Sequence, residues 1–440
     1  MDRGLRAAAL PERVRIDDLD QAGRGIAHVD GKTVFVAGAL PGEQVRIART
    51  RHRRRHDEAA IVELLEASPE RVSPRCAHFG VCGGCALQHL APAAQLASRQ
   101  RQVAETLARI GGVQPETWLP PLTGPVWAYR RRARLGCRWV VRKGRVLVGF
   151  RERESPLLAD LTRCETLVEP VGGLLRPLAE LIGGLAIRDR VAQIEVAGGD
   201  EAIALVLRVL AEPGPDDRAR LREFAARWQI GFWLQPGGLE TVRPLEPDPP
   251  PLRYALPGLA AGIEFQPTDF VQVNAAVNAT LVERAAALLQ PGPADRVLDL
   301  FCGLGNFSLP LALRAGRVTG VEGDAALVAR ARSNAARNGL DNVDFHLADL
   351  SAPAADSGWA RQRHDLVLLD PPRAGAREVL PLAAAGRPRR IAYVSCHPGT
   401  LARDAAVLVG QYGYRLVAAG ILDMFPHTAH VETIAVLDPS

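Results

Sequence analysis

The fold is decided by the stretch RVLDLFCGLGNFS, residues 296–308. Its first five residues have the apolar character of a buried strand, and the glycines that follow predict a tight turn into a helix. Gly303 and Gly305 would let the backbone approach a ligand closely, because neither carries a side chain. The stretch therefore predicts a strand, a ligand-binding turn and a helix in succession.

Strands and helices alternate from about Ile263 onward, which predicts a doubly wound parallel sheet. The next two expected strands, 317–321 and 343–347, lead to Glu322 and Asp349. An acid such as Glu322 can accept hydrogen bonds from ribose hydroxyls, and Asp349 could reach an adenine amino group. Ser308 replaces the third glycine of the dinucleotide fingerprint, which disfavours a pyrophosphate and favours S-adenosylmethionine. An ordinary strand-to-helix turn is the alternative.

Two further strand ends carry reactive side chains. Strand 365–369 leads to Asp370-Pro371-Pro372-Arg373, and strand 391–394 leads to Ser395-Cys396-His397-Pro398. Parallel strands bring their carboxyl ends to one edge of the sheet, where open α/β folds build their sites. Cys396 is therefore the candidate nucleophile, with a buried packing role as the alternative. Cys137 and Cys302 are expected to be packing residues, and Glu432 is either a general base or a surface acid.

The first part of the chain has a different pattern. Short alternating segments between residues 14 and 65, broken by Asp30-Gly31 and Pro41-Gly42, predict a small β-barrel. Residues 49–56 hold five arginines and two histidines, which suit either phosphate contacts or a solvated loop. Residues 129–250 predict a mixed α+β region, which ends in a proline-rich linker.

Cys76, Cys82 and Cys85 form a compact group of thiols, and Cys164 is a plausible fourth ligand. Four thiolates suit zinc or an iron–sulfur cluster, and frequency alone slightly favours zinc. We find neither a signal peptide nor a membrane span in the sequence, so we expect a cytoplasmic protein in which disulfides are rare. The net charge of +5 is compatible with a polyanionic partner but is weak evidence alone.

Taken together, these motifs resemble the RNA uracil-C5 methyltransferases that use S-adenosylmethionine, and the barrel and cysteines narrow the resemblance to the type that acts on uracil 1939 of 23S ribosomal RNA. The resemblance covers nearly the whole chain. It implies a nucleophilic Cys396, with Glu432 as the base that removes the C5 proton. It implies a [4Fe–4S] cluster in place of zinc. The implied ligands of the cluster are Cys76, Cys82, Cys85 and Cys164, and the implied contacts of the methyl donor are Gln272, Phe301, Asn306, Glu322, Asp349 and Asp370.

The resemblance also implies the domain organisation. The fold class expected is α/β, with a TRAM barrel of the OB type at 8–67 and a central α+β domain at 68–92 and 125–255. A Rossmann-like class I methyltransferase domain is expected at 93–124 and 256–440. The partner would be 23S ribosomal RNA, bound by a monomer without an obligate protein partner and without a membrane.

Three other functions remain open from the sequence. Another ribosomal uracil or the tRNA T-loop is the closest alternative, although tRNA enzymes of this family generally lack the barrel and the cysteine group. A non-catalytic RNA-binding factor in ribosome assembly would have no need for Cys396 with Glu432. A thiol redox enzyme is disfavoured, because Cys82 and Cys85 lack a thioredoxin-like context.

Overall fold

The chain, described by a computed structural model over residues 12–353 and 358–440, divides into two compact units. The first contains the described residues up to Gln102, with Glu152–Ser155 and Pro426–His430. The second contains Val103–Arg151, Pro156–Phe425 and Val431–Ser440. Residues 8–11 of the predicted barrel lie outside the described residues. The three predicted domain boundaries stay a prediction.

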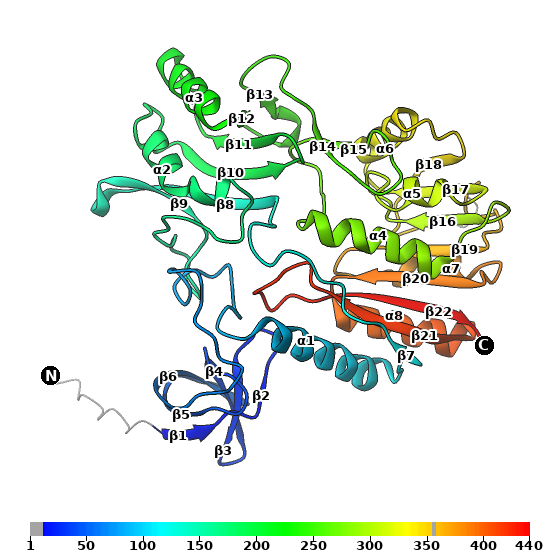
Figure 1. Cartoon of the computed structure of the whole chain (residues 1–440), viewed down its shortest axis with the longest axis horizontal. Helices are drawn as coiled ribbons and strands as arrows, with labels where there is room; N and C mark the ends of the chain where they lie inside the picture. The colour runs from blue at the N-terminus through cyan, green and yellow to red at the C-terminus, as the bar shows by residue number, and fades with distance from the viewer. Residues whose placement is uncertain (1–11, 354–357) are drawn as a thin grey trace. The chain divides into compact units, whose positions relative to one another are not determined.

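The first unit is built on a six-stranded sheet with the order β1-β5-β6-β4-β3-β2 (Figure 1). Alternate residues of these strands, among them Val34, Val36, Val45 and Ile47, point into a buried apolar core. Contacts between β1 and β3 close the sheet, and the predicted small barrel is confirmed. The strands are β1 (Glu12–Arg15), β2 (Asp18–Leu19), β3 (Gly25–Val29), β4 (Lys32–Ala37), β5 (Gln44–His52) and β6 (His56–Glu66).

A helix, α1 (Pro92–Thr106), follows the cysteine group, and the boundary between the two units falls within it. It continues into a π-helical turn, η1 (Leu107–Gly111). Gly112 ends this turn with a φ of 61°, a left-handed conformation that glycine adopts without strain. The helical stretch therefore ends at Gly111-Gly112.

The second unit begins with a mixed α+β region, as the sequence predicts. Its sheet has the order β13-β12-β11-β10-β8-β9, with two helices packed on it. The elements are β8 (Arg132–Val140), η2 (Val141–Lys143), β9 (Arg145–Gly149), η3 (Val171–Gly173), α2 (Leu175–Gly183), β10 (Val191–Gly198), β11 (Ile203–Val209), α3 (Pro215–Trp228), β12 (Gly231–Gln235), η4 (Leu239–Thr241) and β13 (Arg243–Pro244). The predicted linker runs from β13 towards a short hairpin, β14 (Leu252–Tyr254) and β15 (Ile263–Phe265).

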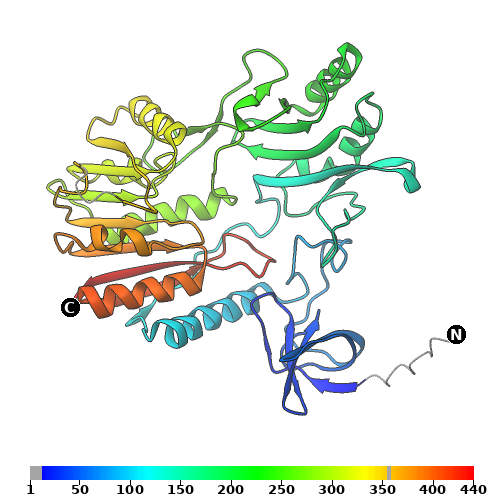
Figure 2. The same cartoon turned by 180° about the vertical axis from the view of Figure 1, so that it is seen from behind.

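An eight-stranded sheet with the order β18-β17-β16-β19-β20-β22-β21-β7 forms the rest of the second unit. Helices lie on both of its faces, with α4 in front in Figure 1 and α8 in front in the reverse view of Figure 2. The strands are β7 (Thr117–Trp118), β16 (Arg296–Leu300), β17 (Arg317–Glu322), β18 (Val343–Leu347), β19 (Leu366–Leu369), β20 (Arg390–Ser395), β21 (Tyr414–Leu422) and β22 (Glu432–Pro439). The helices are α4 (Ala275–Leu289), α5 (Ser308–Ala312), α6 (Ala325–Arg337), η5 (Arg377–Val379), α7 (Leu380–Ala384) and α8 (Pro398–Tyr412).

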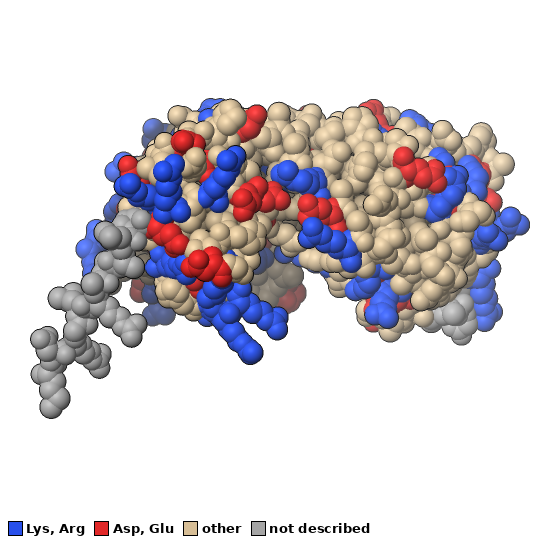
Figure 3. Space-filling view, turned by 90° about the horizontal axis from the view of Figure 1, so that it is seen from below, with Lys and Arg blue, Asp and Glu red and all other residues tan. Residues whose placement is uncertain are grey.

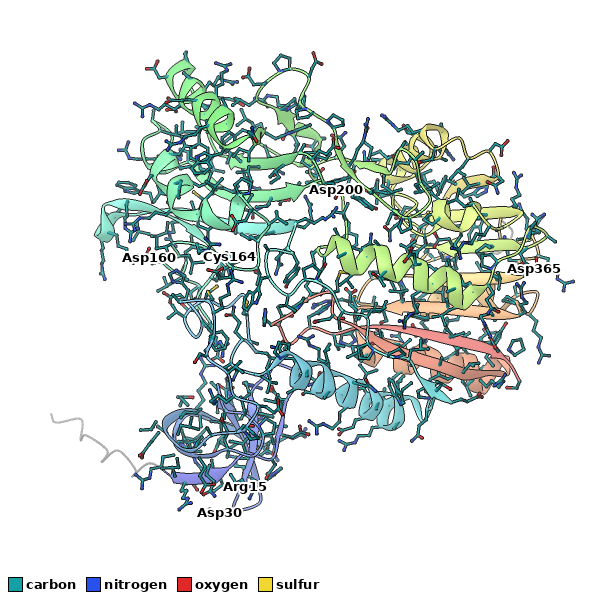
Figure 4. The ribbon with its side chains drawn as sticks, in the orientation of Figure 1. Arg15, Asp30, Asp160, Cys164, Asp200 and Asp365 are labelled. Atoms are coloured by element: carbon teal, nitrogen blue, oxygen red, sulfur yellow. The ribbon has the colours of Figure 1, made fainter. Side chains whose placement is uncertain are left out.

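Strands β16 to β20 run parallel, whereas β22 is antiparallel to both of its neighbours. The strand order reverses between β16 and β19, and open α/β sheets bind ligands at such a switch point. Asp365, labelled in Figure 4, marks the amino-terminal end of β19, on the opposite edge from that crevice. The predicted doubly wound sheet is therefore confirmed, and its switch point lies at the turn after β16.

Candidate active site

Strand register brings the predicted site residues to one edge of the sheet. Leu300 of β16 pairs with Leu369 of β19, and Leu369 pairs with Tyr393 of β20. The residues that follow these strands are Phe301, Asp370 and Cys396, so their side chains emerge at neighbouring positions. Three signals that are far apart in sequence thus belong to one site.

A cavity of about 390 Å³ opens at this edge. Cys396 and Glu432 line it together with most of the predicted cofactor residues, which are Gln272, Phe301, Asn306, Glu322 and Asp370. Asp349 is not among the residues that line it; its carboxylate is exposed and accepts hydrogen bonds from Ser351. Phe270, at the same wall, exposes 72% of its surface. The structure therefore assembles seven of the eight predicted residues in one cavity.

The turn after β16 has the backbone shape of a ligand-binding loop. Gly303 and Gly305 have φ values of 54° and 87°, and a Cβ at Gly303 would project into open space. Phe301 also has a positive φ, 66°, which is uncommon for a bulky residue and is typical of strained functional turns. The Glu322 carboxylate accepts hydrogen bonds from the Gly303 and Gly323 amides, at 3.0 and 2.7 Å. Glu322 is thereby fixed at the cavity wall, where its carboxylate could accept hydrogen bonds from ribose hydroxyls.

Asn306 is positioned by two residues that sequence reasoning missed. Its side-chain oxygen accepts hydrogen bonds from the Tyr254 hydroxyl at 3.1 Å and from the Asn278 amide at 2.9 Å. The Asn306 amide donates back to Asn278 at 3.0 Å. Tyr254 follows the proline-rich linker and Asn278 lies in a helix, so neither position carries a sequence signal. Both become recognisable only once the fold packs them against the turn.

Asp299 is a third missed residue, buried beneath the cofactor turn. Burial raises its pKa to about 7, while a hydrogen bond from the Ser308 hydroxyl opposes that shift. Among the described residues, its second oxygen has no hydrogen-bond partner. Ser308, which replaces the third glycine of the dinucleotide fingerprint, therefore has a structural role as the partner of a buried acid.

Cys396 lies at the cavity wall and is half buried. Burial raises the pKa of its thiol, and the negative charges of Glu432 and Asp370 raise it further, whereas Arg373 lowers it. Glu432 is only 6% exposed. The pKa of Asp370 is well above its usual range, because the cavity removes it from bulk water and Glu432 lies near it. Within the described part of the chain, Arg373 is the cation in this balance that favours the thiolate.

The competing cysteines of the catalytic domain and the central region are inert by position. Cys137 and Cys302 are both buried, and burial raises their pKa, that of Cys137 to about 12. Cys302 belongs to the cavity lining, but its sulfur is closely packed, since a Cβ on Gly320 of β17 would come within 3.0 Å of it. A thiol that stays protonated is a poor nucleophile, so the packing role expected for both residues agrees with their burial.

Three of the predicted cluster cysteines lie on one loop of the first unit. The Gly84 amide is 3.4 Å from the Cys82 sulfur, and Arg153 donates a hydrogen bond to the Cys85 carbonyl at 3.0 Å. Half-buried thiols with an N–H···S contact and a nearby guanidinium fit a thiolate-ligated cluster chemically. Within residues 12–353 and 358–440, however, no group of three or more His, Cys, Asp or Glu side chains is arranged to hold a metal ion.

The fourth predicted ligand, Cys164, belongs to the second unit and is labelled in Figure 4. Its sulfur lies 3.3 Å from the Thr166 hydroxyl, and its amide donates to the Gly172 carbonyl. A hydroxyl beside a sulfur can stabilise a thiolate. The ligand set of Cys76, Cys82, Cys85 and Cys164 stays a prediction.

The basic segment of the barrel extends β5 and β6 into a hairpin with its turn at residues 53–55, and Arg51, Arg53, Arg54 and Arg55 are exposed. Asp57, fully buried at the base of the hairpin, forms ion pairs of 2.6 Å with Lys32 and with Arg49. The hydrogen bond from Lys32 lowers the pKa of Asp57 to about 2. The face in Figure 3 shows Lys and Arg interspersed with acidic residues. The number of basic residues therefore does not mark an RNA-binding surface, and what distinguishes the hairpin is where its arginines lie.

The fold and the site define a class I methyltransferase with an N-terminal TRAM domain. Residues 261–439 match the family model of tRNA (Uracil-5-)-methyltransferase, and residues 12–70 match the TRAM domain of tRNA (uracil(54)-C(5))-methyltransferase. A 23S rRNA (uracil(1939)-C(5))-methyltransferase RlmD of Alkalilimnicola ehrlichii is 56% identical over 99% of this chain and 98% of its own. The protein of the same name from Methylococcus capsulatus is 50% identical over 98% and 97%. The chain therefore belongs to the 23S rRNA (uracil(1939)-C(5))-methyltransferase family, as its motifs predicted.

Among solved structures, the tRNA (uracil-54, C5)-methyltransferase of Pyrococcus abyssi, in complex with S-adenosyl-L-homocysteine, has the same fold. Its TM-score is 0.74 at 24% identity, over 97% of this chain and all of that one. Since the matching TRAM model is itself that of a tRNA enzyme, a barrel does not separate rRNA enzymes from tRNA enzymes. The barrel by itself is therefore no argument against a tRNA substrate.

No helix in the described part of the chain has both the length and the apolar character that crossing a membrane requires.

Proposed function

We propose that this chain transfers a methyl group from S-adenosylmethionine to C5 of a uracil in 23S ribosomal RNA, at the position named 1939 in its relatives. One observation carries the chemistry. A thiol and a carboxyl group, Cys396 and Glu432, line the same cavity as the cofactor turn. Membership of the family supports the reaction and the class of substrate.

For the methyl donor, the residues of the turn supply the contacts. Glu322 would accept the ribose hydroxyls, and Gly303 leaves open space for the backbone to approach the ligand. Asn306, held by Tyr254 and Asn278, would bind with Gln272 and Phe301 around the donor. Asp349 would contact the adenine edge. When bound, S-adenosylmethionine supplies an electrophilic methyl group.

Uracil C5 is too weak a nucleophile to accept a methyl group unaided, so the chain must activate it. The Cys396 thiolate attacks C6, forming a C6–S bond and shifting the ring electrons into an enolate that is nucleophilic at C5. After C5 gains the methyl group, Glu432 removes the C5 proton. The C5–C6 double bond re-forms, the C6–S bond breaks and the sulfur leaves as thiolate. Atoms and charges balance without an oxidant or a reductant.

The geometry suits these two roles. Cys396 lies at the carboxyl edge of β20 and Glu432 lies at the amino edge of β22, so the thiol and the base act on one ring. The target base must leave its stack to enter a cavity of about 390 Å³. We therefore expect an irregular or single-stranded RNA segment as substrate.

The barrel would bind RNA phosphates through the exposed arginines of the β5–β6 hairpin. A buried carboxylate, Asp57, fixes Lys32 and Arg49 at the base of this hairpin. Because such contacts displace counterions, RNA affinity should fall steeply with salt. The protein is proposed to act as a cytoplasmic monomer.

We further propose a [4Fe–4S] cluster on Cys76, Cys82, Cys85 and Cys164, with zinc as the alternative metal. Anaerobic purification followed by metal and sulfide analysis decides between them. Four iron and four sulfide per chain are expected, with loss of both after Cys82→Ser and no change after Cys137→Ser. Stoichiometric zinc without sulfide would contradict the cluster.

The second candidate is methylation of a tRNA T-loop uracil, favoured by the fold shared with the archaeal tRNA enzyme. A single assay distinguishes the candidates. Purified protein is incubated with labelled S-adenosylmethionine and with unmodified 23S rRNA or tRNA, and 5-methyluridine is then mapped. Label in 23S rRNA alone supports the proposal, label in tRNA alone supports the second candidate, and no label in either supports a non-catalytic RNA-binding factor.

A further inference from the structure

A buried acid outside the cavity ties two parts of the active site together. Asp404, in α8, is 0% exposed and does not line the cavity. One of its oxygens accepts hydrogen bonds from the Ala376 amide and the Tyr393 hydroxyl, each at 2.7 Å. The other oxygen accepts the guanidinium of Arg403 at 2.8 Å. No partner of this carboxylate belongs to the cofactor site, so the methyl-transfer chemistry alone does not explain it.

One of these partners, the Ala376 amide, belongs to the loop that follows β19, and a second, Arg403, contacts that loop. This loop runs from Asp370 through Pro371, Pro372 and Arg373 to Ala376. At its start, the Asp370 amide donates to the Leu300 carbonyl. At its end, Ala376 donates to Asp404, and the guanidinium of Arg403 donates to the Ala374 carbonyl at 2.9 Å. The loop is therefore held at both ends, and two prolines stiffen it between them.

The close packing of this loop leaves no room for a side chain. Gly375 has a φ of 87°, and a Cβ there would come within 2.5 Å of Arg403 and 2.6 Å of Asp404. The loop backbone thus rests directly on the Arg403–Asp404 ion pair. Any loss of that pair would free the loop end that lies three residues after Arg373.

The third partner, Tyr393, belongs to the strand that precedes the nucleophile. Tyr393 is fully buried in β20 and lies three residues before Cys396, which directly follows that strand. Asp404 therefore joins the strand that carries the thiol to the loop that carries Arg373. Among the charged groups that act on Cys396, Glu432 and Asp370 oppose the thiolate and Arg373 favours it. The loop that Asp404 holds therefore carries both Asp370, at the cavity wall, and Arg373, the cation that favours the thiolate.

We propose that Asp404 is a positioning residue for methyl transfer, which fixes the loop Asp370–Ala376 against β20 so that Arg373 supports the Cys396 thiolate. The inference rests on the proposed function for its biological meaning. The contacts of Asp404 do not depend on the proposed function, because they exist whatever the substrate is. A test that reads the thiol directly can therefore succeed or fail independently of the methylation assay.

The primary test is the pH dependence of Cys396 alkylation in the full-length protein, followed with iodoacetamide by mass spectrometry of the peptide that contains Cys396. Asp404→Asn keeps the size of the side chain but removes the charge that holds Arg403. We expect the midpoint of alkylation to move up by about one pH unit, because the loop that carries Arg373 is no longer held against β20. Arg373→Gln should give a shift of the same size.

The double variant Asp404→Asn/Arg373→Gln separates positioning from a general effect on the fold. If Asp404 acts through Arg373, the double variant should show no larger shift than Arg373→Gln alone. The matched control is Asp438→Asn, which removes a second Arg–Asp pair of 2.7 Å, with Arg390, in the same sheet. It should leave the alkylation profile unchanged. Additive shifts in the double variant would overturn the proposal.

Tyr393→Phe keeps the test decisive if Asp404→Asn does not fold. It removes one hydrogen bond to Asp404 but retains the buried ring, and it should shift the midpoint in the same direction by a smaller amount. In methylation assays, Asp404→Asn should lower kcat about tenfold with little change in KM for S-adenosylmethionine. A folded Asp404 variant, or a folded Tyr393→Phe, whose alkylation profile overlays that of the wild type would overturn the inference. Absence of methylation by the wild type would instead refute the proposed function.

Discussion

Cys396 and Glu432 lie opposite each other across two antiparallel strands. In the ladder between β20 and β22, Ser395 pairs with Thr433, and one further step of the same register places Cys396 across from Glu432. In the described sheet, β22 is the only strand that runs opposite to the parallel strands β16–β20. Its reversal brings a residue near the carboxyl terminus of the chain to the same edge as the nucleophile. Cys396 therefore directly follows the end of one strand of this pair, and Glu432 begins the other.

The first prediction concerns the base. Glu432→Gln removes the proton acceptor but leaves Cys396 free to attack, so the methylated covalent intermediate should accumulate. We expect turnover to fall at least about 100-fold and a protein–RNA complex to persist on a denaturing gel. Glu378→Gln, which changes an acid outside the cavity, should give no complex. Normal turnover of Glu432→Gln would exclude this carboxylate as the base.

The second prediction concerns the cofactor. Glu322→Gln weakens the acceptor for the ribose hydroxyls, and the affinity for S-adenosylmethionine should fall about tenfold in isothermal titration calorimetry. The matched control is Asp324→Asn, two residues later, where the carboxylate caps α6 by accepting the Ala326 and Leu327 amides. It should change cofactor affinity little. Equal losses in the two variants would indicate a folding effect rather than a cofactor contact.

The third prediction is a pH dependence of stability that originates at Asp299. Burial raises its pKa from 3.8 to about 7, so the folded state prefers the protonated acid. Its contribution to stability is complete below pH 3.8 and is lost as the pH rises through 7, by up to about 4 kcal/mol. Asp299→Asn, which still accepts the Ser308 hydroxyl, should therefore show a flatter dependence of the melting temperature between pH 4 and 7. A variant with an unchanged slope would contradict the assignment.

The fourth prediction concerns the barrel. Replacing Arg53, Arg54 and Arg55 by alanine should weaken RNA binding and reduce the slope of log affinity against log salt by about two to three. Cofactor affinity should stay unchanged. Arg46→Ala, on the same barrel but paired with Glu63 at 2.9 Å, is the control and should leave the slope nearly intact. An unaltered slope in the triple variant would remove the hairpin from the RNA interface.

Much of this account could be predicted from the sequence because its signals are local. A strand end followed by glycines, an acid or a thiol is visible within a few residues, and parallel topology then implies that these ends share an edge. The barrel, the parallel sheet and the placement of Glu322 and Asp370 near Cys396 follow from such signals, whereas Gln272, Phe301 and Asn306 were implied by the family resemblance.

The remaining features depend on packing between distant segments. Tyr254 and Asn278 reach Asn306 only after the chain folds, and Asp299 and Asp404 look like ordinary acids until their burial is known. The sequence position of Glu432 did not show whether it is a base or a surface acid. Its place beside Cys396 depends on the pairing register of β20 and β22, which no local sequence pattern encodes. Buried polar groups of this kind are determined by tertiary structure alone.

The most direct test of the central claim uses 23S rRNA fragments that carry 5-fluorouracil at the target position. Fluorine at C5 cannot leave as a proton does, so the covalent intermediate should remain, and digestion followed by mass spectrometry locates the attached residue. The account predicts methylated 5-fluorouridine bonded to the peptide that contains Cys396, and no adduct with Cys396→Ala. An adduct on another residue, or full turnover by Cys396→Ala, would contradict it.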